Sequence, residues 1–404
     1  MSPSPGELHR PTWAEIDLDA LADNLALVRG RVGSRPILAV VKADAYGHGA
    51  VRVALALQEQ GIDLLGVALP EEGVELRAAG VRCPILVLGG FAPPQADLLL
   101  IHDLTPAIYR PDQVASLRAA AERRGVVAAA HLKIDTGMGR LGVPAGALPS
   151  FLPVLQAASG RVRLSGAFSH LAVADDPDDP FTRAQLVLFE EALEELGRAG
   201  LRPDLVHIAN SAAVMDHRPA WMSLVRPGIM LYGYPPSERM TPLPLRPVLS
   251  LRARIIYIKD VPPGASLGYG RTWIAPRPSR IASLPLGYDD GLPRLLGNRG
   301  HVLVRGRPAP IVGRISMDLT TVDVTGIPEA ALGDEAILIG ASGQARLGAD
   351  QLAAWAETIH WEVLCGIGPR VPRLYRRGRE QIFVSRFATI LAGECDGRYD
   401  ERAR

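Results

Sequence analysis

The chain has 404 residues, of which 48% are hydrophobic, and a formal net charge of +1 at neutral pH. This length exceeds what a single hydrophobic core usually supports, so we expect two domains. The near-neutral balance gives no indication of a nucleic-acid or membrane-surface partner, and no apolar run is long enough to span a bilayer. The three cysteines, Cys83, Cys365 and Cys395, are too widely spaced for a disulfide framework or a metal motif, which predicts a cytoplasmic protein without a metal site.

The first part of the chain alternates between short apolar runs and helical patterns. After a loose tail over residues 1–10, a short strand leads into a helix that ends near Gly30. Eight apolar runs then have the character of buried strands: 37–41, 64–69, 85–88, 104–109, 128–134, 164–168, 205–208 and 224–231. Helical stretches lie between them, such as 50–60, 70–79, 111–124 and 182–199. Eight alternating strands predict a TIM-type (β/α)8 barrel over residues 11–243. An open doubly wound sheet is the alternative, but no strand is followed by its dinucleotide-binding glycine motif.

The pattern changes at a proline-rich linker around residues 242–248. Beyond it, short apolar runs follow one another at closer spacing, with glycine and proline turns between them. Residues 244–392 are therefore predicted to form a mostly antiparallel β domain, built as a small barrel and interrupted by one helix over 347–358. Residues 393–404 are charged and are expected to be a frayed tail.

The apolar run 37–41 ends at Lys42, and a glycine-rich turn follows as far as Gly49. A cation at this position must be paired, lose its charge or reach solvent, and solvent is the better interpretation for an isolated lysine. A neutral, desolvated lysine is instead a nucleophile, and one of its uses is a Schiff base with pyridoxal phosphate. Further predicted strands also end in polar residues: Asp135 after Lys133, His170, Asn210 with Ser211, and Arg226. Because active sites of barrels lie at this rim, the pattern predicts a polar pocket that binds an anion.

Several short motifs extend this observation along the chain. They are residues 39–49 (AVVKADAYGHG), 133–140 (KIDTGMGR), 210–211 (NS), 226–229 (RPGI), 267–270 (LGYG), 287–288 (GY), 313–318 (GRISMD) and 370–375 (RVPRLY). With these motifs in this order, the chain resembles the alanine racemases, which are fold-type III pyridoxal phosphate enzymes. The resemblance implies an isomerase that interconverts L- and D-alanine through a pyridoxal phosphate aldimine and two bases, and that supplies D-alanine for peptidoglycan. A broad-specificity or serine-type racemase on the same scaffold is the alternative.

The resemblance also implies the roles of the chemical groups. Lys42 would carry the cofactor and act as one base, and Tyr269 would be the base on the opposite face of the substrate Cα. A phenol with a pKa of about 10 is a poor base at neutral pH, so His170 and Arg226 would stabilise its phenolate through a hydrogen-bonded chain. Arg226 would also face the pyridine nitrogen and, because it is always protonated, leave that nitrogen without a proton.

The other implied contacts concern the phosphate and the substrate. The implied phosphate contacts are Tyr46, Ser211, Tyr375 and the backbone N–H groups of Gly228 and Ile229, with Asn210 as a neighbour that is equally well explained as a turn residue. Arg140 and the backbone N–H of Met317 would hold the substrate carboxylate, and Lys133 and Asp318 would support Arg140. The family's counterpart of Lys133 is often carbamylated, but a simple pair between Lys133 and Asp135 is left open by the sequence. Tyr288 and Tyr375 would narrow the entrance.

The resemblance implies a homodimer, because the family builds each site from the barrel of one subunit and the β domain of the other. Two departures are mild: Ser316 stands where many relatives have cysteine, and residues 171–175 are only loosely similar to the family. A non-catalytic cofactor-binding barrel is disfavoured by the β domain with its motif around Tyr269. A decarboxylase of the same fold type is disfavoured by Arg226, where such enzymes have an acidic residue.

Overall fold

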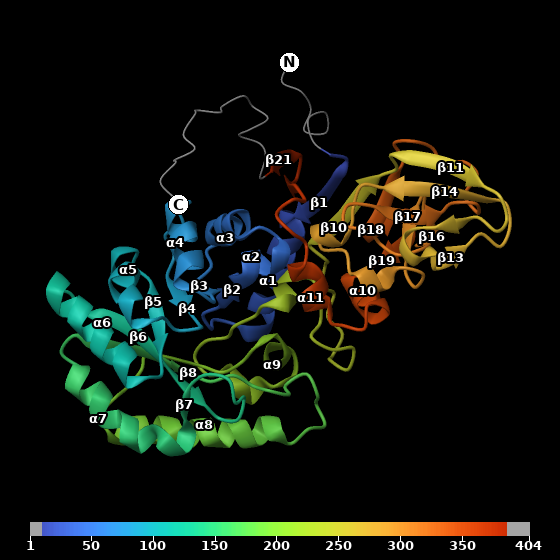
Figure 1. Cartoon of the computed structure of the whole chain (residues 1–404). Helices are drawn as coiled ribbons and strands as arrows, with labels where there is room; N and C mark the ends of the chain where they lie inside the picture. Colours follow the sequence, from blue (N-terminus) through green and yellow to red (C-terminus); the bar gives the residue numbers. More distant parts are fainter. Residues whose placement is uncertain (1–9, 386–404) are drawn as a thin grey trace, which may run out of the picture. The chain divides into compact units, whose positions relative to one another are not determined.

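The computed structural model describes residues 10–385, which form two compact units (Figure 1). One unit comprises Ala20–Arg246, and the other combines the residues up to Asp19 with those from Pro247 onwards. The predicted tail over residues 393–404 lies outside the described residues, as does the predicted N-terminal tail apart from Arg10.

The unit Ala20–Arg246 is built on a parallel sheet whose strands alternate with helices (Figure 1). The strand order is β2-β3-β4-β5-β6-β8-β9, with a short β7 beside β6. The strands are β2 (Leu38–Val40), β3 (Leu64–Val67), β4 (Ile85–Val87), β5 (Thr105–Ile108), β6 (Ala128–Asp135), β7 (Val143–Pro144), β8 (Val162–Phe168) and β9 (Leu205–His207). The helices are α1 (Leu18–Val32), α3 (Ala50–Glu59), α4 (Pro70–Ala78), α5 (Ala96–Ile101), α6 (Pro111–Arg124), α7 (Leu148–Ala158), α8 (Phe181–Arg198) and α9 (Ser211–Asp216).

Seven of these strands, all except the short β7, follow one another around the sheet. An extended segment around Val225 is the eighth and closes the sheet into a barrel. On one side, the Ser223 N–H donates to the carbonyl of Val206 in β9 at 3.1 Å. On the other side, the Leu38 N–H of β2 donates to the carbonyl of Val225 at 2.9 Å. The predicted (β/α)8 barrel is therefore confirmed. The last segment is shorter than predicted, because Pro227 has no N–H to continue a ladder and the short helix η4 (Ile229–Tyr232) follows.

The helices of the barrel bury one face each, as their sequence spacing predicts. In α8, the buried residues recur every three or four positions along the chain, namely Thr182, Gln185, Phe189, Ala192 and Leu196. This spacing places them on one side of the helix, and the charged residues between them lie on the other. The strands β2 and β4 are buried at every residue, which is typical of parallel strands covered on both faces.

The second unit is mostly antiparallel, with β1 and β20 as its parallel pair among the described residues. Its main sheet has the order β16-β15-β18-β10-β1-β20-β21, with β19 beside β18. The strands are β1 (Thr12–Asp17), β10 (Leu249–Arg254), β15 (His301–Val304), β16 (Arg307–Pro310), β18 (Glu335–Ser342), β19 (Ala345–Leu347), β20 (Arg373–Arg377) and β21 (Glu380–Val384). A smaller sheet consists of β11 (Tyr257–Val261), β14 (Ser279–Leu284) and β17 (Thr320–Asp323), and two helices accompany the sheets, α10 (Ala349–Trp355) and α11 (His360–Cys365).

Three details differ from the sequence analysis. Strand β1 pairs with β10 and β20 of the second unit, although the predicted barrel domain began at residue 11. Its partners lie far away in sequence, so its own alternation of buried and partly buried residues does not identify them. The predicted small barrel is instead a set of separate sheets, which an isolated bridge between Ile311 and Val322 connects. Arg10, assigned to the loose tail, is anchored by a two-pronged ion pair with the fully buried Asp290, at 2.6 and 2.7 Å.

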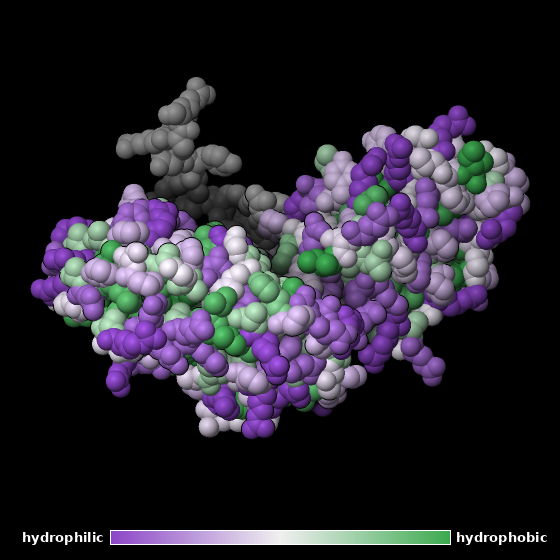
Figure 2. Space-filling model, turned by 90° about the horizontal axis from the view of Figure 1, so that it is seen from below, coloured by the Kyte–Doolittle hydropathy of each residue, from purple (hydrophilic) through white to green (hydrophobic). Residues whose placement is uncertain are grey.

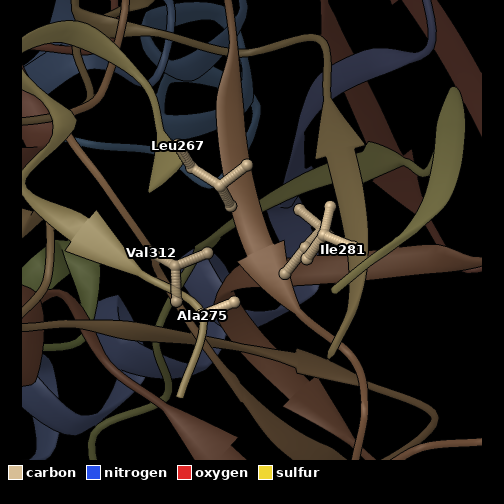
Figure 3. Packing of buried hydrophobic residues seen from close by; sticks show 5 residues of the cluster. Leu267, Ala275, Ile281 and Val312 are labelled. Carbon is tan, nitrogen blue, oxygen red and sulfur yellow. The ribbon is translucent and has the colours of Figure 1, made fainter. Parts of the chain in front are cut away.

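A hydrophobic cluster in the second unit supports the hairpin of β12 (Ser266–Leu267) and β13 (Trp273–Ile274). It consists of Val261, Leu267, Ala275, Ile281 and Val312 (Figure 3). Leu267 is the last residue of β12 and Ala275 directly follows β13, so the cluster holds both strands from which the tip extends. That tip contains the predicted base Tyr269.

The surface in Figure 2 shows hydrophilic and hydrophobic residues interspersed on the face in view. Within residues 10–385, no helix is both long enough and apolar enough to cross a membrane.

Candidate active site

Lys42 lies two residues beyond the end of β2, at the rim formed by the carboxyl ends of the barrel strands, and it is partly buried. The four residues that follow it, 43–46, have φ of 52–54° and ψ of 41–54°. They form one turn of left-handed helix within the segment labelled α2 (Lys42–Gly47). Each L-residue in this conformation costs about 1–2 kcal/mol, so the turn stores several kcal/mol of strain. Such strain persists only where the surroundings enforce it, and it is concentrated at functional sites.

Polar contacts within the segment hold the left-handed turn in place. The Ala45 N–H donates to the carbonyl of Val41 at 2.9 Å, which closes the turn onto the end of the strand. The Asp44 carboxylate accepts from the Ala50 N–H at 2.7 Å, which joins the turn to the start of α3. Gly47 and Gly49 have φ of 79° and 93°, which lets the chain leave the turn without a steric penalty.

Three of the predicted phosphate-binding groups lie together beside this turn. Tyr46 is buried, and its ring packs against Tyr232 with 4.9 Å between centroids. The Gly228 N–H donates to the Ser211 hydroxyl at 2.8 Å. A Cβ on Gly228 would lie 2.6 Å from the Tyr46 hydroxyl, so this close approach requires glycine.

Asn210 has an evident structural function at this place. Its side chain accepts a hydrogen bond from the Ala213 N–H at 3.1 Å and caps α9. Asn210 thus acts here as a turn residue, which is the alternative that the sequence analysis left open. Ile229, the other predicted backbone donor, begins η4 directly after Gly228 and is buried.

Arg226 is a nearly fully buried cation whose contacts are neutral groups. Its guanidinium donates to His207 Nδ1 at 2.8 Å and to the carbonyls of Ser169 and Ile208 at 2.7 and 3.2 Å. It also lies over the ring of Phe168, 5.4 Å from the centroid. Burial lowers the pKa of Arg226 to about 9, which leaves the group cationic at neutral pH.

Two histidines extend from Arg226 into the barrel interior. Because a guanidinium can only donate, His207 Nδ1 is an acceptor, and the proton of this neutral ring resides on Nε2. That nitrogen lies 2.9 Å from His131 Nδ1 and donates to it. Burial lowers the pKa of both rings, that of His131 to about 3, with the nearby Arg226 charge as the next cause. Gly166 leaves room for this arrangement, since a Cβ there would lie 2.5 Å from the His131 ring.

His170 lies near the same guanidinium, with 3.5 Å between its Nδ1 and an Arg226 nitrogen. This distance is at the outer limit of a hydrogen bond. Burial, followed by the charges of Arg226 and Arg140, holds the pKa of His170 well below its usual value. A neutral ring that accepts at Nδ1 presents a donor at Nε2, which suits the stabilisation of a phenolate.

Lys133 and Asp135 turn to different partners, so their simple ion pair is not what the structure shows. The Lys133 amine donates to the carbonyl of Leu88 at 3.3 Å and lies 5.3 Å from the centre of the Phe168 ring. The Asp135 carboxylate instead accepts from the N–H groups of Gly137 and Gly139 in the turn after β6. Burial, with smaller contributions from the charges of Arg140, Arg226 and Lys42, lowers the pKa of Lys133 from 10.5 to about 8.

The chain contains only three lysines, Lys42, Lys133 and Lys259, against 41 arginines. Two of the three therefore belong to this rim. Arginine cannot replace lysine where a neutral amine is needed, because its guanidinium stays protonated.

Arg140, which follows the turn after β6, is exposed. The other predicted site residues lie in the second unit. Tyr269 is the first residue of η5 (Tyr269–Arg271), between Gly268 and Gly270 with φ of 69° and 71°, and its side chain is 71% exposed. Tyr288 and Met317 lie on two loops that touch, since the Tyr288 N–H donates to the carbonyl of Ser316 at 3.1 Å. Both are exposed, whereas Tyr375 is buried in β20 beside Ile16 of β1.

Asp318, predicted to support Arg140, pairs with Arg370 of its own unit at 2.7 Å. Arg370 also contacts Asp289 and so joins the loops that carry Tyr288 and Met317. This joining arginine belongs to the 370–375 motif, but its function could not be read from the motif alone.

Sequence reasoning missed His131 and did not assign a function to His207. The period of two along β6 places His131, Lys133 and Asp135 on one face, so the position of His131 was available from the strand pattern. Its contact with His207 was not, because the two lie 76 residues apart.

Comparisons with known proteins agree with this fold. Residues 16–236 match the model of the alanine racemase N-terminal domain, and residues 248–375 match that of the C-terminal domain. The alanine racemase of Halothermothrix orenii is 46% identical over 91% of this chain and 97% of its own length. That of Syntrophobacter fumaroxidans is 48% identical over 88% of this chain and 95% of its own length.

Solved structures show the same likeness. The alanine racemase of Clostridium difficile 630 superposes with a TM-score of 0.89 at 35% identity, covering 93% of this chain and 98% of that one. The alanine racemase of Bacillus anthracis with bound L-Ala-P superposes with a TM-score of 0.88 at 34% identity, covering 93% of this chain and 98% of that one. The fold and these relatives thus define a barrel isomerase of the pyridoxal phosphate-dependent class. The chain belongs to the alanine racemase family.

The left-handed turn can be tested by replacing Ala43 with glycine. Glycine relieves the steric penalty of positive φ but loses more backbone entropy on folding, and each effect is about 1 kcal/mol. We expect Ala43→Gly to change the free energy of unfolding by less than about 0.5 kcal/mol. The matched control is Ala115→Gly in the right-handed helix α6. Ala115 is also exposed, and this variant should lose about 1 kcal/mol. Equal losses in thermal unfolding of the two variants would contradict the left-handed turn.

The lowered pKa of Lys133 predicts a pH-dependent stability. An amine with a pKa of about 8 in the folded chain and 10.5 when unfolded destabilises the fold by about 3 kcal/mol below pH 8, and this cost disappears as pH rises towards 10.5. We expect Lys133→Met apoprotein to melt higher than wild type at pH 7, with the difference shrinking by pH 9.5. Lys259→Met, at an exposed position, should show no such trend. A carbamylated Lys133 would reverse the sign at pH 7, since its anion would be held by the neighbouring cations.

Proposed function

We propose that the protein interconverts L- and D-alanine with pyridoxal 5′-phosphate held at Lys42. The observation that carries the proposal is the strained turn of Lys42 beside the cluster of Tyr46, Ser211 and Gly228. The cluster fits a phosphate group, because hydroxyls and backbone N–H groups converge there and a Cβ on Gly228 would fill the space next to Tyr46. Ile229, Asn210 and Tyr375 complete the proposed set.

When bound, pyridoxal phosphate supplies an aldehyde that condenses with amines and a ring that draws electrons from the substrate Cα. Arg226 would face the ring nitrogen as a permanent cation that cannot take up a proton. Its three polar anchors, His207 and the carbonyls of Ser169 and Ile208, keep it in one orientation. An unprotonated nitrogen limits the electron withdrawal, which favours return of a proton to Cα over side reactions.

Racemisation needs a base on each face of Cα. Lys42 would hold or release the proton on one face, and Tyr269 would do so on the other. The neutral His170, close to Arg226, would donate to the Tyr269 oxygen and stabilise its phenolate.

The substrate carboxylate would be held by Arg140 and by the Met317 N–H. Arg140 follows the turn organised by Asp135, and its charge acts on both Lys133 and His170. Lys133 would support Arg140 if carbamylated, and Asp318 would support it with a carboxylate that also binds Arg370.

The proposal includes a homodimer with shared sites. Tyr269, Tyr288 and Met317 are 71%, 42% and 51% exposed in the single chain, although each would have to contact cofactor or substrate. A second copy that contributes its barrel would cover them. Tyr288 and Tyr375 would narrow the entrance and favour a small substrate side chain. A cytoplasmic location and the supply of D-alanine for peptidoglycan belong to the same proposal.

Covalent trapping tests the assignment of Lys42. Borohydride reduction in the presence of pyridoxal phosphate should label Lys42 alone, with Lys133 and Lys259 as internal controls in the same peptide map. Lys42→Ala should lose the label and about a thousandfold or more in turnover. Activity on L-alanine, L-serine and L-lysine separates the proposal from a broad-specificity or serine-type racemase. A label on Lys133 instead would refute it.

Tyr269→Phe tests the second base and the shared site together. The variant should keep the label at Lys42 but lose exchange of the α-proton of L-alanine far more than that of D-alanine, whereas Tyr257→Phe, also exposed, should lose neither. Reassociated mixtures of Lys42→Ala and Tyr269→Phe subunits should regain up to about a quarter of wild-type activity, because half the dimers then contain one intact site. No recovery after confirmed subunit exchange would exclude a shared site.

A further inference from the structure

Glu72 in the first turn of α4 connects the ends of two neighbouring barrel strands. One carboxylate oxygen accepts from the Ala43 N–H at 2.7 Å. The other accepts from the Ala68 N–H at 2.6 Å and from the Leu69 N–H at 3.1 Å. Ala43 directly follows Lys42 beyond β2, and Ala68 follows β3.

Capping of α4 explains only part of this geometry. A glutamate at the third position of a helix commonly accepts from the N–H of the residue before the helix, which here is Leu69. The bond from the Ala43 N–H reaches 29 residues back along the chain. At 2.7 Å it is shorter than the capping bond from the Leu69 N–H, at 3.1 Å. It ties the helix end to the strained turn that follows Lys42.

The Ala43 N–H needs an acceptor from outside its own turn. Ala43 is the first residue of the left-handed turn, so the closing hydrogen bond of that turn comes from Ala45 and not from Ala43. Glu72 supplies this acceptor, and its other oxygen is fixed to the end of β3. Without it, the backbone after Lys42 is free to relax from positive φ, which redirects the lysine side chain.

We propose that Glu72 is a positioning residue for Lys42, which holds the left-handed turn so that the lysine amine stays aimed at its reaction partner. This inference rests on the proposed function of Lys42 as the cofactor-bearing residue.

The substitution Glu72→Gln tests this proposal, because it alters the hydrogen bonds that the Glu72 carboxylate accepts. All three partners of Glu72 are N–H donors, and they use both of its oxygens. In Glu72→Gln one of these oxygens becomes an NH₂ group, so whichever way the amide turns, a donor faces a donor. Glu75→Gln is the matched control, since Glu75 lies one turn further along α4 and is exposed.

The first readout is amide hydrogen exchange in the apoprotein, for the peptide that covers residues 42–49. Loss of hydrogen bonds to a charged acceptor should speed its exchange about tenfold in Glu72→Gln and leave it unchanged in Glu75→Gln. The second readout is the rate at which pyridoxal phosphate forms its reducible adduct with Lys42, which should fall about tenfold in the same variant. Turnover should fall with it, while KM for L-alanine changes little.

Glu72→Asp provides a second variant in case the glutamine protein folds poorly. Its carboxylate is one methylene shorter, so it can still cap α4 but no longer spans to Ala43, and it should show the same two effects. If either variant loses thermal stability while exchange of 42–49 and the adduct rate match Glu75→Gln, Glu72 is a helix cap only and the proposal is wrong. Absence of the adduct in wild type would refute the proposed function instead, and hydrogen exchange would still decide whether Glu72 holds the turn.

Discussion

The active rim depends on one backbone constraint, the left-handed turn after Lys42. An ordinary right-handed continuation of β2 would carry the chain straight into a helix and direct the following side chains differently. The left-handed turn instead places Tyr46 beside Gly228 and Tyr232, which follow the neighbouring barrel segment around Val225. The closed barrel makes this possible, because β2 is hydrogen-bonded on both sides and cannot yield to the strain.

A second constraint is electrostatic. Lys42, Lys133, Arg140 and Arg226 share the rim, and their mutual repulsion contributes to the lowered pKa of Lys133. The contacts of Arg226 are neutral histidines, carbonyls and an aromatic ring. A cationic site of this kind favours an anionic ligand, and a phosphate and a carboxylate together satisfy it. The histidines stay neutral because burial and the same cations oppose a further positive charge.

The sequence was informative where the chemistry is local. The strand ending at Lys42 and the barrel period were predictable from short apolar runs, and the left-handed turn leaves only the glycines at 47 and 49 as a trace. The contacts that decide between roles were not predictable, since they join residues distant in sequence. Lys133 and Asp135 lie on the same face of one strand, which suggests an ion pair. The Asp135 carboxylate instead accepts hydrogen bonds from the glycines of the following turn. The strand β1 reads as the start of the barrel and pairs instead with strands more than 230 residues away.

Lys42 and Lys133, two of the three lysines in the chain, differ in how the backbone directs their side chains. Both are amines near the same cations, and burial lowers the pKa of Lys133 to about 8, so reduced basicity does not by itself single out Lys42. Lys133 extends from β6, two residues before that strand ends, and its amine donates to the carbonyl of Leu88 and lies over Phe168. Lys42 stands at the point where a strand gives way to a strained turn whose first N–H is bound by Glu72. In the proposed function, the direction set by the backbone would therefore select Lys42 as the lysine that meets the phosphate beside Tyr46, Ser211 and Gly228.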